Sequence, residues 1–386
     1  MSRVITFSTN ISAGHRRAAE AVARAIKDFI PGAVIAERDA MKLLGNTRRN
    51  LLTRAYLGII ERYPSLWNYL YHSKKMMPFI TGLGRNFILK SVNKFEDELD
   101  TFQPDVIICT QAIPARIIAD IRRRGRCGRC RAPLLAVATD YGIHPYWIDP
   151  HIDAYAVPCE PAAIELKQEG VPEEKIFVTG IPVDKVFENP PLKEIARKRL
   201  GILSDRGIVL VMGGGNGLGL KISDIESIES AQGVSEVIVI TGSNDQLAME
   251  LRALPLHKKI IRRIFPIVER IEDYYAAADI LVSKPGGLTM AEATTMGIPI
   301  VMISPLPGQE VRNADFLERC GAAVMAGTSE ELRSTIANIL RDSIKRQNLV
   351  DAAKAVGRPS AAMQIARIAM SLSKYGRLDS TRAVND

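Results

Sequence analysis

The sequence predicts an α/β protein built from two tandem, Rossmann-like, doubly wound domains. Three observations lead to this prediction: a length of 386 residues, short apolar segments that alternate with helical patterns, and a break in that alternation near mid-chain. A single hydrophobic core rarely extends beyond about 250–300 residues, so a chain of this length is expected to divide. Apolar strands separated by helices are typical of a parallel sheet covered on both faces.

The first half of the chain contains five apolar segments that predict buried strands. Residues 3–8 form the first, and a helix with apolar spacing follows over about 16–29. The remaining predicted strands are residues 104–110, 134–139, 154–158 and 176–179, with helical patterns over 111–124 and 161–169.

The alternation pauses at residues 180–183 and 189–191, where glycine and proline gather, and then restarts. Further strands are predicted over 207–212, 236–241, 259–264, 279–283 and 298–303. We therefore expect an N-terminal domain of residues 1–182 and a C-terminal domain of residues 183–386, whose last helices can pack back on the first. Because such sheets bind ligands at the carboxyl ends of their strands, the two domains are expected to face an interdomain cleft.

Composition excludes several classes of protein. With 47% hydrophobic and 24% charged residues the chain resembles a soluble globular protein, and no run of about 18 apolar residues predicts a membrane span. The N-terminal residues MSRVITFSTN lack a secretory leader, so we expect a cytoplasmic protein. Five cysteines do not suit a disulfide framework, and Cys127 and Cys130 lack the second ligand pair that a zinc site requires.

The net charge of +8 is concentrated in residues 42–90, a segment with nine basic residues, one acid and seven of the chain's 22 aromatic residues. Cations can meet anionic headgroups while aromatic rings lie at the interface, so the segment predicts contact with an anionic membrane surface. A solvated helical hairpin with basic edges is the alternative. A second basic cluster covers 116–131, but no recognisable nucleic-acid motif accompanies either cluster, so no nucleic-acid partner is expected.

Two loops of the first domain contain candidate catalytic residues. Gly14 and His15 follow the first strand, where small residues admit a ligand close to the backbone and a neutral imidazole can accept a proton from a hydroxyl group. Asp140 follows the 134–139 strand, in a segment that also holds Trp147, and it could orient that imidazole or hold an acceptor hydroxyl. The structural alternatives are a helix-capping histidine and a turn aspartate beside a core tryptophan.

Three turns of the second domain have the composition of an anion or sugar site. Glycine-rich turns at 213–219 and 285–289 follow predicted strands, and backbone N–H groups there can bind a diphosphate. Glu292 could accept hydrogen bonds from two ribose hydroxyls, and Gln309 with Glu310 from several hydroxyls of a sugar. The alternatives are a tight turn, a helix-dipole partner and an ordinary polar helix start. The candidate residues in the two glycine-rich turns are Gly213, Gly214, Gly215, Asn216, Gly286, Gly287, Leu288 and Thr289.

In their order along residues 3–340, these segments resemble one family, the monogalactosyldiacylglycerol synthases and processive diacylglycerol glucosyltransferases. This family is related to the transferase that adds N-acetylglucosamine to lipid I. The most specific matches are Lys284–Ala293 and Pro307–Glu310, supported by Gly14-His15, the glycine run at 213–219 and the His-Pro-x-Trp at 144–147. The sequence departs from the family at Ser12 and Ala13, where glycines are usual.

The resemblance implies a GT-B fold, no required metal or cofactor, a UDP-sugar donor and diacylglycerol as acceptor. It places Gly14 on the acceptor-side loop, makes His15 the base, and puts Phe265 and Pro266 where backbone contacts uracil. It further implies that residues 286–289 bind the diphosphate, Glu292 the ribose, and Gln309 with Glu310 the sugar. The expected enzyme is a bacterial hexosyltransferase bound peripherally to the inner face of the cell membrane.

The expected reaction is inverting transfer from UDP-glucose or UDP-galactose to the sn-3 hydroxyl of diacylglycerol. The sequence has no D-x-D triplet, so backbone amides are expected to neutralise the leaving diphosphate instead of a metal ion. Three alternatives share this fold: transfer of N-acetylglucosamine to a polyprenyl-linked acceptor, a UDP-sugar epimerase, and a non-catalytic UDP-sugar sensor.

Overall fold

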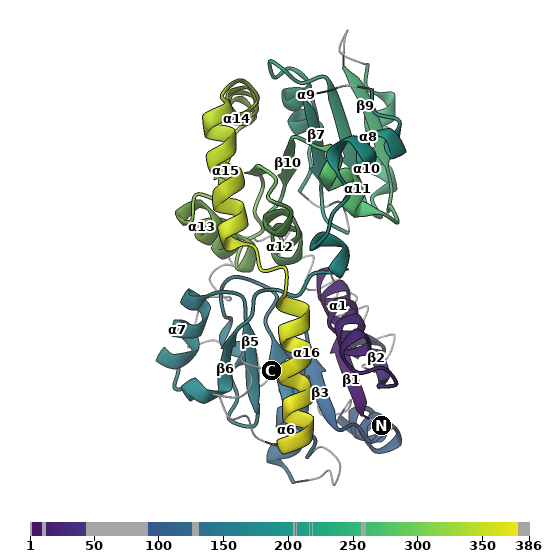
Figure 1. The fold of residues 1–386 in the computed structure, drawn as a ribbon, viewed down its shortest axis with the longest axis vertical. Coiled ribbons are helices and arrows are strands. Elements are labelled where there is room, and N and C mark those ends of the chain that lie inside the picture. Colours follow the sequence, from purple (N-terminus) through teal and green to yellow (C-terminus); the bar gives the residue numbers. More distant parts are fainter. Residues whose placement is uncertain are drawn as a thin grey trace. The chain divides into compact units, whose positions relative to one another are not determined.

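A computed structural model gives the fold of the chain (Figure 1). It describes residues 2–9, 13–43, 92–125, 131–203, 205, 207–215, 217, 219–255 and 260–376. The described chain forms two compact units. The first contains the residues up to Asp184, Pro307–Gln309 and the residues from Ser360 onward, and the second contains Lys185–Leu306 and Glu310–Pro359. Most of the basic, aromatic segment 42–90, together with Cys127, Cys130 and Asn216, lies outside the described residues.

The first unit is a six-stranded parallel sheet in the order β2-β1-β3-β4-β5-β6, with helices on its faces (Figure 1). Its strands are β1 (Arg3–Ser8), β2 (Val34–Asp39), β3 (Val106–Cys109), β4 (Leu134–Val137), β5 (Ala154–Val157) and β6 (Ile176–Val178). Its helices are α1 (Ala13–Phe29), α2 (Ala40–Leu43), a helix over 92–102, α6 (Ala112–Arg123), α7 (Glu160–Gln168) and α16 (Ala361–Tyr375), with short 3-10 turns η1 (Pro145–Trp147) and η2 (Glu173–Lys175).

The second unit is also a six-stranded parallel sheet, in the order β12-β11-β10-β7-β8-β9. Its strands are β7 (Ile208–Met212), β8 (Glu236–Ile240), β9 (Ile261–Phe265), β10 (Ile280–Ser283), β11 (Ile300–Met302) and β12 (Ala323–Met325). Its helical elements are η3 (Lys185–Phe187), α8 (Lys193–Leu200), α9 (Ile222–Glu229), α10 (Asp245–Ala253), α11 (Ile271–Ala277), α12 (Gly287–Met296), α13 (Gln309–Arg319, whose first residue groups with the first unit), α14 (Ser329–Arg341) and α15 (Ser343–Val356).

Each sheet has a point where the strand order reverses. In the first unit the chain moves outward in one direction from β1 to β2 and in the other from β3 to β6, so the reversal lies between β1 and β3. In the second unit it lies between β7 and β10. At such a point the loops after two adjacent strands leave in opposite directions, which opens a crevice at the carboxyl edge of the sheet.

The C-terminal helix α16 belongs to the core of the first unit. Its apolar face, with Ile365, Ala366 and Ala369 fully buried, packs in one cluster with Val22 and Ile26 of α1 (Figure 1). Both helices are rich in alanine, which favours a helix intrinsically and permits close approach between helices. The end of the chain thus stabilises the sheet at which the chain begins.

The structure confirms all ten predicted strands and adds two that the sequence analysis missed, β2 and β12. Both missed strands lie at a sheet edge. In β2 (VIAERD) three apolar residues are followed by three charged ones, and β12 (AVM) is short and has a single β-branched residue, so neither shows the continuous apolar, β-branched run of a central strand. Helix α1 begins at Ala13, three residues before the predicted start, which places Gly14 and His15 in its first turn.

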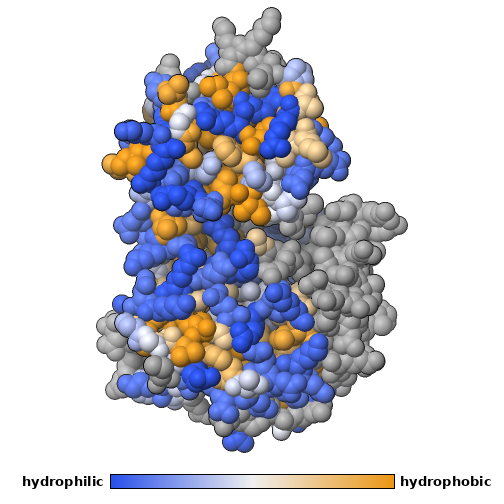
Figure 2. All heavy atoms as spheres, turned by 90° about the vertical axis from the view of Figure 1, so that its right-hand side faces the viewer, coloured by the Kyte–Doolittle hydropathy of each residue, from blue (hydrophilic) through white to orange (hydrophobic). Residues whose placement is uncertain are grey.

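The space-filling view shows hydrophobic patches separated by broad hydrophilic areas on one face of the molecule (Figure 2). Among the described residues, no helix has both the length and the apolar character needed to cross a bilayer.

Candidate functional site

His15 lies where the ends of two strands of the first sheet meet α1. Its Nδ1 atom is 2.9 Å from the hydroxyl oxygen of Thr139, which follows β4. The hydroxyl of Thr110, which follows β3, donates to the backbone carbonyl of His15 at 2.8 Å. Thr139 and Thr110 are both buried, so His15 is held from two sides at the crevice of the first sheet. This geometry fixes which ring nitrogen faces the protein.

The surroundings of His15 favour the neutral imidazole. Burial lowers the pKa of His15 below its ordinary value of 6.5, while the charge of Asp140 and a backbone hydrogen bond with Thr110 partly oppose that shift. A neutral imidazole can accept a proton at physiological pH. Asp140 therefore acts on His15 through its charge, and Thr139 is the described partner of Nδ1. The expectation that Asp140 orients the imidazole remains a prediction.

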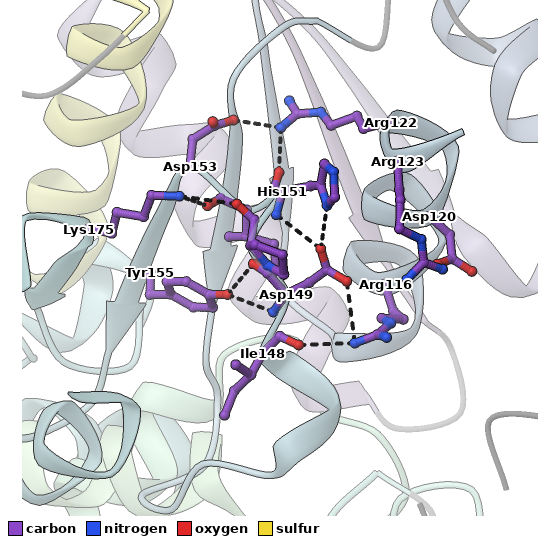
Figure 3. A network of polar contacts seen from close by, with 12 residues as sticks. Arg116, Asp120, Arg122, Arg123, Ile148, Asp149, His151, Asp153, Tyr155 and Lys175 are labelled. Carbon is purple, nitrogen blue, oxygen red and sulfur yellow. Dashed lines mark hydrogen bonds and ion pairs between the residues drawn. The ribbon is translucent and has the colours of Figure 1, made fainter. Parts of the chain in front are cut away.

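A network of polar contacts holds the loop that follows Asp140 (Figure 3). The buried carboxylate of Asp149 accepts from the backbone N–H of His151 at 3.0 Å, and it lies 3.4 Å from the guanidinium of Arg116 on α6. Arg122, one turn and a half further along α6, bonds Asp153 at 2.7 Å. Three of the described arginines in 116–131, namely Arg116, Arg122 and Arg123, form ion pairs with aspartates of the same unit (Figure 3).

Two residues of the same loop have structural roles. The His144 side chain accepts from the backbone N–H of Tyr146 at 3.1 Å and so caps η1. The side chain of Trp147 is buried, with an exposed fraction of 8%. The core-tryptophan alternative describes Trp147 correctly. These contacts hold the loop that follows Thr139 and Asp140.

In the second unit, the glycine run follows β7 at the crevice between β7 and β10. The backbone folds back so that the N–H of Gly217 donates to the carbonyl of Gly214 at 3.1 Å, and Gly215 accepts from Ser243 at 3.0 Å. A Cβ atom on Gly213 would lie 2.7 Å from Gly217 Cα, and one on Gly217 would lie 2.3 Å from the carbonyl oxygen of Thr241. Glycine is thus required for the packing of this turn.

The second predicted turn leads from β10 into α12 and leaves the helix N-terminus without a side-chain cap. Gly286 is the N-cap residue and makes no side-chain hydrogen bond, so the first N–H groups of α12, from Gly287 to Thr289, have no partner within the helix. Ser283 donates to the carbonyl of Met212 at 2.9 Å and ties this turn to the end of β7. The two turns, both rich in backbone N–H groups, therefore lie next to each other at one edge of the sheet. Such an arrangement suits the binding of a diphosphate.

Glu292 and Glu310 are both buried, and each has a defined partner. Glu292 on α12 accepts from the hydroxyl of Tyr275 at 3.1 Å, and Tyr275 packs edge-on against Phe187. Glu310 on α13 forms an ion pair with Lys284 at 2.6 Å and accepts from the backbone N–H of Leu306 at 2.9 Å. Asn313, on the same helix as Glu310, donates to the carbonyl of Pro285 at 2.9 Å, which brings α13 against the second turn.

Phe265 ends β9, and Pro266 follows it. The carbonyl oxygen of Phe265 accepts from the backbone N–H of Thr241 at 2.9 Å, and its ring packs edge-on against Tyr274. Gln309 is the first residue of α13 and is half-buried. A cavity of about 470 Å³ lies beyond β9, lined by Arg199, Leu200, Val268, Glu269, Arg270, Asp273 and Tyr274. None of the predicted site residues lines that cavity.

Four contributors were missed by the sequence analysis as members of the site: Thr110, Thr139, Tyr275 and Lys284. Thr110 and Thr139 each follow a buried strand, and that position is the signal that could have identified them. Lys284 lies inside the motif that was singled out, but its partner Glu310 is 26 residues away along the chain. Tyr275 gave no sequence signal, because an aromatic residue in a helix is more often part of the core.

Each half of the chain matches a known protein family. The family described as monogalactosyldiacylglycerol (MGDG) synthase matches residues 15–183, and the glycosyltransferase family 28 C-terminal domain matches residues 208–368. The chain is 32% identical over 262 residues to the processive diacylglycerol beta-glucosyltransferase of Bacillus licheniformis, covering 67% of each chain. It is 30% identical over 265 residues to the protein of the same name from Bacillus pumilus, covering 68% of each.

Solved structures give the fold. MurG of Acinetobacter baumannii matches with a TM-score of 0.61 at 15% identity, covering 96% of this chain and 100% of that one. MnaA of S. aureus in complex with UDP matches with a TM-score of 0.64 at 12% identity, covering 96% of each chain. With its two parallel six-stranded sheets, the chain has the GT-B fold, as the sequence predicted.

The packing of the glycine-rich turn predicts a specific loss of stability. The G217A substitution places a Cβ atom against the Thr241 carbonyl at a residue with φ of +60°. We expect a loss of about 2–4 kcal/mol in the free energy of unfolding, from backbone strain and overlap together. Gly201 has the same φ but no atom within 4 Å of the added Cβ, so G201A should cost only about 1 kcal/mol. Equal losses in denaturant titrations of the two variants would contradict this account.

If His15 is the base, as the sequence predicts, its surroundings determine the pH dependence of catalysis. Because burial lowers its pKa, the acid limb of kcat/KM should lie below pH 6.5. D140N removes the charge that raises this pKa, so the limb should move to still lower pH, whatever the effect on the maximal rate. D120N, which removes a carboxylate of α6 that pairs with Arg123, is the control and should leave the limb in place. A limb that moves to higher pH in D140N would contradict the assignment of His15 as the base.

Proposed function

This chain belongs to the family of monogalactosyldiacylglycerol synthases and processive diacylglycerol glucosyltransferases, and from that premise we propose that it transfers a hexose from UDP-glucose or UDP-galactose to the sn-3 hydroxyl of diacylglycerol, with inversion at the anomeric carbon. The observation that carries the proposal is that the crevices of the two sheets contain complementary chemical groups. One presents a histidine whose pKa is lowered by burial, and the other presents two adjacent turns rich in backbone N–H groups.

In this proposal His15 of the first unit activates the acceptor. Its unprotonated ring nitrogen accepts the proton of the sn-3 hydroxyl as that oxygen attacks the anomeric carbon. The Thr139 hydroxyl at Nδ1 holds the ring, and the negative charge of Asp140 stabilises the imidazolium that forms. An acceptor alcohol has a pKa far above 7, so a positioned base is needed, and general bases typically contribute about 10²- to 10⁴-fold in rate.

The second unit holds the donor in this proposal. Glu292 accepts from the ribose hydroxyls, and Gln309 with Glu310 from the hexose hydroxyls. The backbone of Phe265 and Pro266 contacts the uracil. Negative charge grows on the leaving diphosphate, and the N–H groups of the two turns neutralise it together with the positive end of the α12 dipole. Removing one such donor typically costs about 2.7–4 kcal/mol in the barrier. We therefore propose that transfer needs no metal ion.

The proposed reaction can be tested with purified protein, diacylglycerol vesicles and one UDP-sugar at a time, followed by mass analysis of the lipids. We expect a hexosyl-diacylglycerol product with UDP-glucose or UDP-galactose, none with UDP-N-acetylglucosamine, and unchanged turnover after adding EDTA. H15A should lose about 10²- to 10⁴-fold in kcat and still bind UDP. K27A, at an exposed residue in the last turn of the same helix, should retain full activity.

Three outcomes would contradict the proposal. If H15A keeps its turnover, the base is another group. If chelation abolishes transfer, a metal ion rather than the backbone neutralises the diphosphate. If the wild-type protein binds UDP but forms no glycolipid with any UDP-hexose, the chain is a UDP-sugar sensor and not a transferase.

We also propose that residues 42–90 attach the protein peripherally to the anionic inner face of the cell membrane, since the lipid acceptor does not diffuse freely through water. Each basic residue near an anionic surface contributes about 1 kcal/mol. Sedimentation with anionic vesicles should therefore fall steeply as salt rises, and the K74A/K75A double variant should bind about 30-fold more weakly. R333A/R341A removes the same charge from α14 and should bind like the wild type. Equal binding to neutral vesicles would contradict the proposal.

A further inference from the structure

We propose that Lys284 supplies a mobile positive charge to the donor site: its ammonium group is held by Glu310 while the site is empty, and it moves to the diphosphate when a UDP-sugar binds. This inference rests on the proposed function and assigns a role to the one basic side chain that the structure places in the two turns from 213 to 215 and from 284 to 289. The released carboxylate of Glu310 is then free to accept from the sugar.

The position of the lysine stem supports the first part of the inference. Lys284 follows β10 directly, and its side chain lies along the glycine-rich turn that follows β7. A Cβ atom on Gly214 would be 3.1 Å from Lys284 Cε, and one on Gly219 would be 3.7 Å from Lys284 Cδ. The glycines thus leave room for the lysine stem as well as for a ligand. The same Cβ position on Gly214 is only 4.0 Å from the Nζ atom.

The ion pair supports the second part. Lys284 Nζ lies 2.6 Å from Glu310 Oε1, and the two side chains are only 16% and 8% exposed. The other carboxylate oxygen, Oε2, accepts from the backbone N–H of Leu306, so Glu310 keeps its position when the lysine leaves. Lysine is suited to such a move, since its ammonium group is a point charge on a flexible four-carbon stem.

The exchange reduces the repulsion between the bound diphosphate and the carboxylates of the site. A diphosphate brings more than one negative charge next to the buried carboxylates of Glu292 and Glu310, and like charges there would oppose binding. A lysine that turns from Glu310 to the diphosphate places a cation beside the incoming charge. The released carboxylate oxygen, Oε1, then hydrogen-bonds to hexose hydroxyls. Binding of the diphosphate and binding of the sugar are therefore coupled through one side chain.

The test is calorimetric titration of UDP, uridine and the UDP-hexose into the full-length protein and its variants. K284M keeps most of the stem and removes the charge, so it should bind UDP about 10- to 100-fold more weakly and uridine within about twofold of the wild type. K284R keeps the charge and should recover most of the UDP affinity. Thermal unfolding of both variants checks that the fold is retained.

E310Q separates the exchange from a purely structural ion pair. Glutamine can still accept from the Leu306 N–H group but does not hold the lysine by charge. We expect E310Q to bind UDP several-fold more tightly than the wild type and the UDP-hexose more weakly. K193M is the matched control, because Lys193 makes an ion pair of the same length, 2.6 Å, with Asp279 just before the opposite end of β10. It should change neither affinity.

The outcomes distinguish this inference from the proposed function. If K284M binds UDP as tightly as the wild type, or loses uridine affinity to the same extent, Lys284 does not bind the diphosphate, although glycolipid synthesis by the wild type would still stand. If E310Q weakens UDP binding, the pair is structural and the exchange is overturned. If the variants behave as expected but no glycolipid forms, the inference holds and the proposed reaction fails. A wild type that binds no UDP overturns both.

Discussion

The reversal of strand order within each parallel sheet is the constraint on which the rest of the structure depends. At β1 and β3 in the first unit, and at β7 and β10 in the second, adjacent loops leave the carboxyl edge in opposite directions. Backbone groups at these two positions are therefore not covered by a following strand or helix. His15 occupies the first crevice, and the two glycine-rich turns with Lys284 occupy the second. The candidate base and the two candidate diphosphate-binding turns therefore follow from this topology.

The two crevices solve different electrostatic problems with different groups. In the first unit, burial lowers the pKa of an imidazole, and a nearby carboxylate limits how far that pKa falls. In the second, the uncapped N-terminus of α12 and the adjacent backbone provide positive potential without a formal charge, and Lys284 provides one formal charge that Glu310 balances. The partial charges of a fixed backbone need no reorganisation when a charged ligand binds, whereas a flexible lysine side chain can move toward the ligand.

How well each strand could be predicted from the sequence depended on how deeply that strand is buried. Central strands such as β3 and β7 are apolar at every position because both faces are covered, so they were evident in the sequence. The edge strands β2 and β12 were missed, since β2 is half polar and β12 is short and has a single β-branched residue. The motifs at Gly14-His15, 213–219 and 284–293 were recognisable because a strand, a turn of small residues and a helix start follow one another locally.

By itself the sequence determined the fold class, the family and the segments that contain the candidate site, because these depend on local patterns and on motifs of adjacent residues. Only the tertiary structure decided which side chains act together. Thr139 meets His15 across 124 residues, and Tyr275 meets Glu292 from another helix. Such pairings depend on which strands and helices become neighbours in the fold. The spacing of residues along the chain does not by itself specify those neighbours.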